Sequence, residues 1–157
     1  LMMTDALLRL SDGQAPTTGT VVASNVIDLA SASGAKASGA QNQLSDVFAG
    51  MPLSILTTVT TAFAGGTSLQ VQAILSASED MSSPVVLGET DAIPLASLTA
   101  GTRIVLDLNR LGPLAAKRYL SVQYKIVGTM TGGNVTTDVV DNVPSGPTAF
   151  KTFLPIK

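Results

Sequence analysis

The chain contains no cysteine, no histidine and no tryptophan among its 157 residues. Without cysteine, a disulfide framework and thiol nucleophiles are excluded. Without histidine, Ser-His-Asp triads and histidine-ligated zinc or iron sites are excluded as well. We therefore expect a protein that is not an enzyme and that carries no cofactor.

Charge is also scarce. Charged residues make up 13% of the chain, about half the roughly 25% of a typical soluble domain. A soluble monomer usually keeps more charge on its surface, and protein interfaces are depleted of charge at their centres. The net charge of −2 argues against a nucleic-acid partner, which needs a basic face. The composition therefore predicts a surface partly covered by other proteins.

Long apolar helices are missing too. Residues 47–78 carry no charge, but Pro52 and several Gly, Ser and Thr residues interrupt them. A membrane helix needs about 20 continuous apolar residues. We expect no membrane partner.

What the sequence does have is an alternation of apolar and polar residues with a period of two, rich in β-branched side chains. Seven to nine such short segments, separated by turn residues, are typical of a sandwich or barrel. The segment 103–108 is nearly all apolar, which predicts a strand covered on both faces. The candidate strands are 21–22, 26–29, 53–63, 68–75, 83–89, 103–108, 118–128 and 134–140.

Two of these segments predict which side chains face inward. In 53–63 they are Leu53, Ile55, Thr57, Val59, Thr61 and Phe63. In 118–128 they are Leu120, Val122, Tyr124 and Ile126.

Gly65-Gly66 stands between two alternating segments. A phosphate-binding loop would be followed by a helix and would carry a lysine, whereas another candidate strand follows here. We interpret the pair as a hairpin turn, because glycine accepts the positive φ of tight hairpins.

The remaining segments lack an apolar stripe. Residues 30–43 are small and polar and predict a surface loop. Three prolines keep the apolar end of the chain extended. The expected organisation is an N-terminal arm or first strand (1–20), a β-sandwich (21–143) and an extended apolar C-terminal tail (144–157).

Two acidic pairs are the remaining candidates for chemistry, Glu79-Asp80 and Glu89-x-Asp91. Paired carboxylates can act in acid–base catalysis or bind calcium. Neighbouring acids in loops at strand ends usually face solvent, so we expect neither catalytic nor metal-binding residues. Whether a calcium ion is bound stays open.

Residues 81–126 resemble a known family in pattern and order. The segment has Ser82-Ser83-Pro84, then Ala92-Ile93-Pro94-Leu95 with Leu98 and Gly101, an apolar strand, and Arg118-Tyr119-Leu120 leading to Tyr124. Upstream, LLRLSDGQAPTTGTVVASNVIDL and TAFAGGTSLQVQAILSASED are similar to the family's opening strands. The family is that of the capsid cement, or decoration, proteins of short-tailed bacteriophages.

The resemblance covers residues 3–128 and implies an all-β fold, a jelly-roll antiparallel sandwich of about eight strands with extended termini. It implies a structural virion protein on the outer capsid surface, made in the host cytoplasm. The implied partners are the major capsid protein, which has the HK97-like fold, and further copies of the chain in a homodimer or homotrimer.

We expect apolar residues near the two ends of the chain to contact the capsid, namely Met2, Met3, Leu7, Leu8, Phe150, Phe153, Leu154 and Ile156. Two other functions remain open, a tail or fibre β-module and a carbohydrate-binding domain for host attachment. The second would be unusual without tryptophan, because sugar-binding surfaces are typically aromatic.

Overall fold

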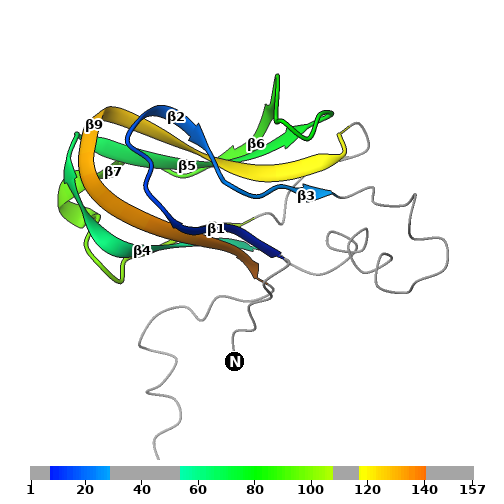
Figure 1. The fold of residues 1–157 in the computed structure, drawn as a ribbon. Coiled ribbons are helices and arrows are strands. Elements are labelled where there is room, and N and C mark those ends of the chain that lie inside the picture. The colour runs from blue at the N-terminus through cyan, green and yellow to red at the C-terminus, as the bar shows by residue number, and fades with distance from the viewer. Residues whose placement is uncertain (1–7, 29–53, 108–116, 141–157) are drawn as a thin grey trace, which may run out of the picture.

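A computed structural model describes residues 8–28, 54–107 and 117–140, and the structural statements below concern these residues. They form nine strands and one short 3₁₀ helix, η5 (Leu95–Ser97) (Figure 1). The strands are β1 (Arg9–Gln14), β2 (Thr18–Val22), β3 (Ile27–Asp28), β4 (Ser54–Gly65), β5 (Ser68–Ser76), β6 (Val85–Glu89), β7 (Ile93–Pro94), β8 (Arg103–Asp107) and β9 (Tyr119–Val140). Within the described part of the chain, no helix is long and apolar enough to cross a membrane.

The longest strand, β9, belongs to two layers. Its second half pairs with β1 on one side and β4 on the other, and β8 follows β4. We call this layer sheet A. Its first half pairs with β2 and β3 on one side and β5 on the other, and β6 and β7 pair with β5. We call this layer sheet B.

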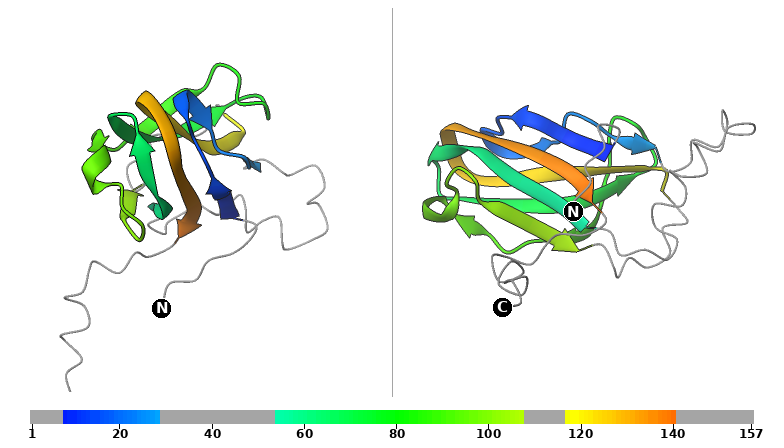
Figure 2. Two further views of the ribbon diagram at one scale, coloured as in Figure 1. Left: turned by 60° about the vertical axis from the view of Figure 1, so that its left-hand side comes forward. Right: turned by 90° about the horizontal axis from the view of Figure 1, so that it is seen from below.

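All these pairings are antiparallel, and the two layers face each other as a sandwich (Figure 2). Both layers contain β9 as an inner strand, flanked by an early strand on one side and a middle strand on the other. This arrangement is the double Greek key of a jelly roll. The predicted all-β jelly-roll sandwich is confirmed.

Two segments expected to be separate strands, 118–128 and 134–140, are one strand of 22 residues. Pairing continues through the glycines between them, because Gly132 and Met130 lie opposite Ala64 and Gly65 of β4. The glycines therefore bend the strand instead of ending it.

The bend of β9 lies against the turn between β4 and β5. Gly65 and Gly66 have φ values of +70° and +64°, as expected. A Cβ added to Gly128 would lie 2.9 Å from the Cα of Gly66, so the two backbones touch. The Thr67 N–H also donates to the Val127 carbonyl, at 2.8 Å.

The interpretation of Gly65-Gly66 as a hairpin turn was wrong in one respect. The described strands β4 and β5 pair with β9 and with other strands, and not with each other. The turn carries the chain from sheet A to sheet B. Positive φ is a local property that sequence can predict, whereas strand pairing depends on the whole sheet.

The core lies between the sheets and is built from the predicted inward faces. Ile55, Val59 and Phe63 are buried in it, as are Leu120, Val122, Tyr124 and Ile126. Thr61 is exposed, contrary to expectation. The pairing of β4 with β9 shifts register on both sides of Thr61, and such an irregularity reverses the face of the residues beyond it.

The segment 103–108 was expected to be covered on both faces, which is also wrong. Its described part, β8, lies at the edge of sheet A and pairs only with β4 among the described strands. Ile104 is buried, while Arg103, Val105 and Asp107 are exposed. A run of apolar residues does not distinguish a central strand from an edge strand whose outer face is half apolar.

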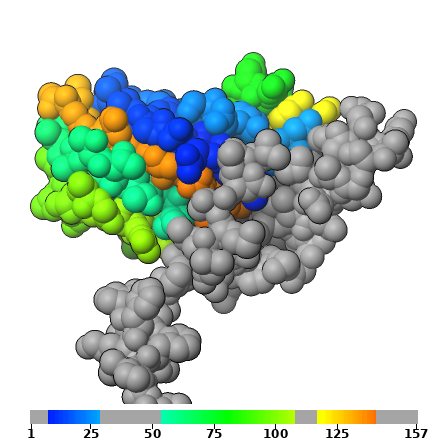
Figure 3. Space-filling view, turned by 60° about the horizontal axis from the view of Figure 1, so that its bottom comes forward, coloured from blue at the N-terminus to red at the C-terminus, as the bar shows by residue number. Residues whose placement is uncertain are grey.

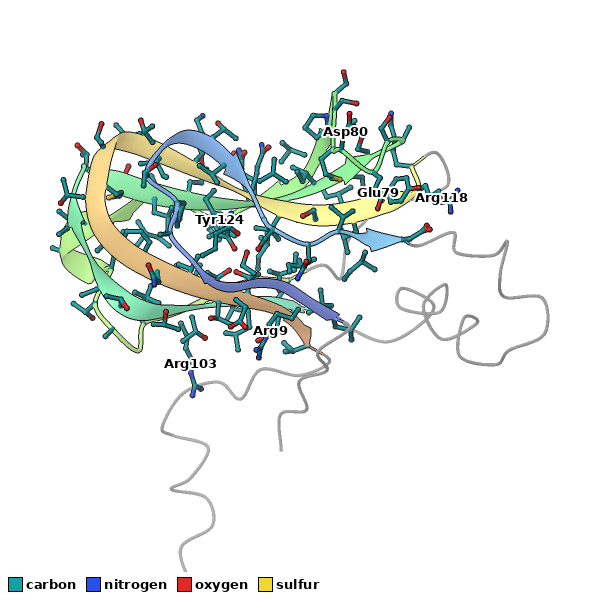
Figure 4. The ribbon with its side chains drawn as sticks, viewed as in Figure 1. Arg9, Glu79, Asp80, Arg103, Arg118 and Tyr124 are labelled. Carbon is teal, nitrogen blue, oxygen red and sulfur yellow. The ribbon has the colours of Figure 1, made fainter. Side chains whose placement is uncertain are left out.

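Four hydroxyl groups form a hydrogen-bonded chain inside the core. Tyr124 Oη shares hydrogen bonds of 2.7 Å with Ser11 Oγ and with Thr137 Oγ1, and Thr137 shares one of 2.9 Å with Thr57. Tyr124 lies between the two sheets in Figure 4. Because Tyr124 and Thr137 lie on opposite halves of β9, their bond joins the two halves across the bend.

Gly65→Ala should destabilise the fold by about 3 kcal/mol, because the new Cβ would lie 2.7 Å from the Thr129 carbonyl oxygen, a backbone atom. Gly19→Ala is a matched control, since Gly19 has a φ of +66° with nothing within 4 Å. It should cost only about 1 kcal/mol, the strain of a left-handed residue. Urea unfolding measures both; equal losses would show that the contact at the bend contributes nothing.

Tyr124→Phe should lower the free energy of unfolding by about 1–2 kcal/mol at neutral pH, because two buried hydroxyl groups lose a partner. Burial raises the pKa of Tyr124 above its ordinary value of 10.0, against a smaller opposing effect of its hydrogen bonds.

The dependence of the free energy of unfolding on pH provides a second test of the buried Tyr124 hydroxyl. Above pH 10 the unfolded chain loses this proton before the folded chain does, so stability falls as pH rises. The Phe variant should show a flatter fall above pH 10, whereas Tyr119→Phe, which leaves the buried Tyr124 hydroxyl in place, should keep the wild-type fall. Identical alkaline slopes for wild type and Tyr124→Phe would contradict this.

Candidate interaction surface

Most of the predicted contact residues lie outside the described residues. This holds for Met2, Met3 and Leu7, and for Phe150, Phe153, Leu154 and Ile156. They stay predictions. Leu8 is described, and it is half-buried against the core. Residues 9–20 of the expected N-terminal arm contribute β1 and part of β2, which pair with β9.

The described surface exposes four large apolar side chains. They are Val85 (50%), Val86 (43%), Val105 (41%) and Val127 (53%). Three of them lie on strands at the margins of the sheets, since β6 is the outer strand of sheet B and β8 that of sheet A. A Cβ on Gly88 of β6 would lie 3.8 Å from Leu106 of β8, so both margins lie on the same side of the sandwich.

Sequence analysis missed these valines. Adjacent apolar residues in a candidate strand are expected to put one side chain inward, and Leu87 does pack against the core. Val86 and Val85 lie opposite Ile74 and Leu75 of β5, and both are exposed on this outer strand. We call these two residues the β6 valine pair.

The loop of residues 77–84, which precedes the β6 valine pair, has an unusual backbone conformation. Met81 and Ser83 adopt positive φ, 55° and 50°, which is uncommon for residues other than glycine. Met81 is buried, and Ser76 Oγ donates to the Ser82 carbonyl at 2.7 Å. The loop is therefore held by its own contacts.

Asp80 lies on this loop, at the upper margin of the molecule in Figure 4. The Ser82 N–H donates to Asp80 Oδ1 at 2.9 Å. Hydrogen bonds from Ser82 hold the pKa of this carboxyl below its usual value, so Asp80 carries a negative charge near neutral pH.

Glu89 of the second acidic pair takes part in a row of hydrogen-bonded side chains on the outer face of sheet B. Gln123 Nε2 donates to Gln72 Oε1, and Gln72 Nε2 donates to Glu89 Oε2, both at 2.6 Å. Glu89 is thereby held on the sheet. No group of three or more acidic side chains in the described ranges is arranged to hold a metal ion.

Arg118 holds two strands of sheet B together. Its guanidinium forms a bidentate ion pair with Asp28, in which Nε donates to Oδ1 at 2.8 Å and Nη2 donates to Oδ2 at 2.7 Å. The same guanidinium lies 5.2 Å from the centre of the Tyr119 ring. The hydrogen bonds to Asp28 raise the pKa of Arg118. The pair fastens β3 to the start of β9.

If the β6 valine pair serves an external contact, removing a valine should leave the isolated domain intact. Val86→Ala should change the free energy of unfolding by less than about 0.5 kcal/mol, as most surface substitutions do. The adjacent Leu87→Ala should cost about 2 kcal/mol, because Leu87 packs against the core. Chemical denaturation compares them, and a loss at Val86 as large as that at Leu87 would assign Val86 to the core.

Comparison with the curated proteins finds no match. Comparison with protein families does find one, the family described as Bbp16, over residues 10–139. The matched region begins in β1 and ends in β9, so it spans every described strand. This chain belongs to the Bbp16 family.

Proposed function

We propose that this protein is a capsid cement protein of a bacteriophage. It binds the outside of the head across neighbouring major capsid protein subunits and stabilises the shell against the pressure of packaged DNA. The observation that carries the proposal is the jelly-roll order of the strands, which is the topology that the resemblance to cement proteins implies. Fold alone supports many functions, so the surface must be consistent with adhesion as well.

The described surface has features suited to adhesion. The β6 valine pair is exposed on an outer strand, beside a loop held in shape by its own hydrogen bonds. A preorganised apolar contact loses little conformational freedom when it binds. The valine pair and the apolar residues near both chain ends are the proposed capsid contacts.

The small number of charges fits the same role. With 13% charged residues, much of the surface can be covered without burying unpaired charges, which is costly. A protein present in many copies, each bridging two subunits, gains strength through multivalency, so a single contact can be modest. Cementing a shell requires binding and no chemical step.

The test adds the purified full chain to mature phage heads assembled without it and follows DNA release on heating with a fluorescent dye. We expect the release temperature to rise and then saturate at a fixed number of copies per capsid subunit. No binding and no shift would overturn the cement role. Tight self-association that resists detergent would then favour a fibre module, and binding on a glycan array would favour host attachment.

Paired variants locate the contact. Val85→Asp/Val86→Asp should lower occupancy on heads at least about tenfold, because burying a charge in an apolar contact costs more than about 1.4 kcal/mol. Val127→Asp places an aspartate on a valine of similar exposure away from β6 and should bind as wild type does. Equal binding by both variants would remove the β6 valine pair from the proposed contact.

A further inference from the structure

The margin of the sandwich at β6 carries charges of one sign. Residues 77–102 contain no lysine and no arginine. Their acidic residues are all exposed, and they are Glu79, Asp80, Glu89 and Asp91. We call these residues the β6 acidic group. Two of them precede the β6 valine pair in the chain and two follow it, so negative charge lies at both ends of this apolar surface.

The β6 valine pair occupies both sides of the margin. Val85 lies opposite Leu75 of β5, and Val86 lies opposite Ile74. Directly opposed residues of an antiparallel pair point to the same face of the sheet. Leu75 belongs to the core between the sheets, so Val85 lies on the inner side of sheet B and Val86 on its outer side. A partner that covers both valines must therefore reach around the margin.

The acidic side chains are near enough to act on such a partner. Glu89 is three residues beyond Val86, which is about 10 Å along a strand. Glu79 and Asp80 belong to the loop that leads into β6, and Figure 3 shows this loop, in bright green, projecting at the upper margin of the molecule. Charges act over about 8–10 Å at moderate ionic strength. A surface that covers the valine pair therefore lies in the field of the β6 acidic group.

The described cations leave this negative charge in place. None of the four carboxylates forms an ion pair with a residue that the structure describes. Arg118 is influenced electrostatically by Glu79, but its guanidinium is already held by Asp28. The β6 acidic group can therefore accept cations from outside.

Two of the carboxylates are also oriented in advance. Gln72 Nε2 donates to Glu89 Oε2 at 2.6 Å, and the Ser82 N–H donates to Asp80 Oδ1 at 2.9 Å. Both donors are neutral, so they fix the positions of the oxygens and keep the charge. Groups that are held before binding lose little conformational freedom when a partner arrives.

We propose that the capsid surface that receives the β6 valine pair is basic, with lysine or arginine side chains around an apolar centre that pair with the β6 acidic group. This inference deepens the proposed function and rests on it. An apolar centre with a polar rim is the usual anatomy of a protein interface. Rim charges of opposite sign steer the two surfaces together and fix their register, whereas like charges would repel.

Salt separates this contact from a purely apolar one. The test mixes the purified full chain with mature phage heads assembled without it and measures the bound copies after the heads are pelleted. Raising sodium chloride from about 50 to about 500 mM should raise the dissociation constant at least about fivefold, because the added ions screen the rim charges. A contact made by apolar groups alone would not weaken with salt.

Charge variants locate the effect. At the lower salt concentration, E79K should slow association with heads at least about threefold and E79Q by less, because reversal adds repulsion whereas neutralisation only removes attraction. D80N should also slow association, and it keeps an oxygen that can accept the Ser82 N–H. The matched control is D12N, which removes one exposed carboxylate charge on β1 and should associate as wild type does. At the higher salt concentration all these proteins should associate at similar rates, whereas a variant with a damaged fold would differ at both.

Three results would overturn this inference and leave the cement role standing. They are head binding that does not weaken with salt, variants of the β6 acidic group that associate as wild type does, and a loss in D12N as large as that in D80N. The last result would assign the effect to overall charge. A wild type that binds heads at neither salt concentration would overturn the cement role and this inference together, so the two failures are distinguishable.

Discussion

The fold depends on one strand that serves both sheets. β9 supplies an inner strand to each layer, so it must bend between them without losing its hydrogen-bonded partners. It does so where the turn at Gly65-Gly66 makes the same crossing from β4 to β5, and the two backbones touch there. No side chain fits between them, so glycine is required on steric grounds. The buried bond between Tyr124 and Thr137 then holds the two halves of β9 together.

With β9 and its neighbours β4 and β5 in the centre, the remaining strands lie at the margins. Three of the four exposed valines of the described surface lie on β6 and β8, which end their sheets on the same side of the sandwich. The two margins have different properties. The edge at β6 is apolar beside an acidic loop, whereas β8 carries one charge of each sign.

Local patterns in the sequence were enough for much of the fold. Alternation identified most of the inward residues of β4 and β9, because a strand with one buried face must alternate. The positive φ at Gly65 and Gly66 followed from the same kind of local constraint. The errors were not local. Thr61 faces solvent because of an irregular register with β9, and two apparent strands proved to be one because their glycines bend the chain while pairing continues.

The sequence by itself determined the class of the protein: an all-β, charge-poor chain without the residue types of most active sites. It could not determine which strands end the sheets, because an apolar segment looks the same at an edge and in the centre. The tertiary structure decided that 103–107 is an edge with Arg103 and Asp107 exposed at its ends, and that Val85 and Val86 face outward. Edge position and register are set by partners far away in the chain, and the candidate contacts depend on both.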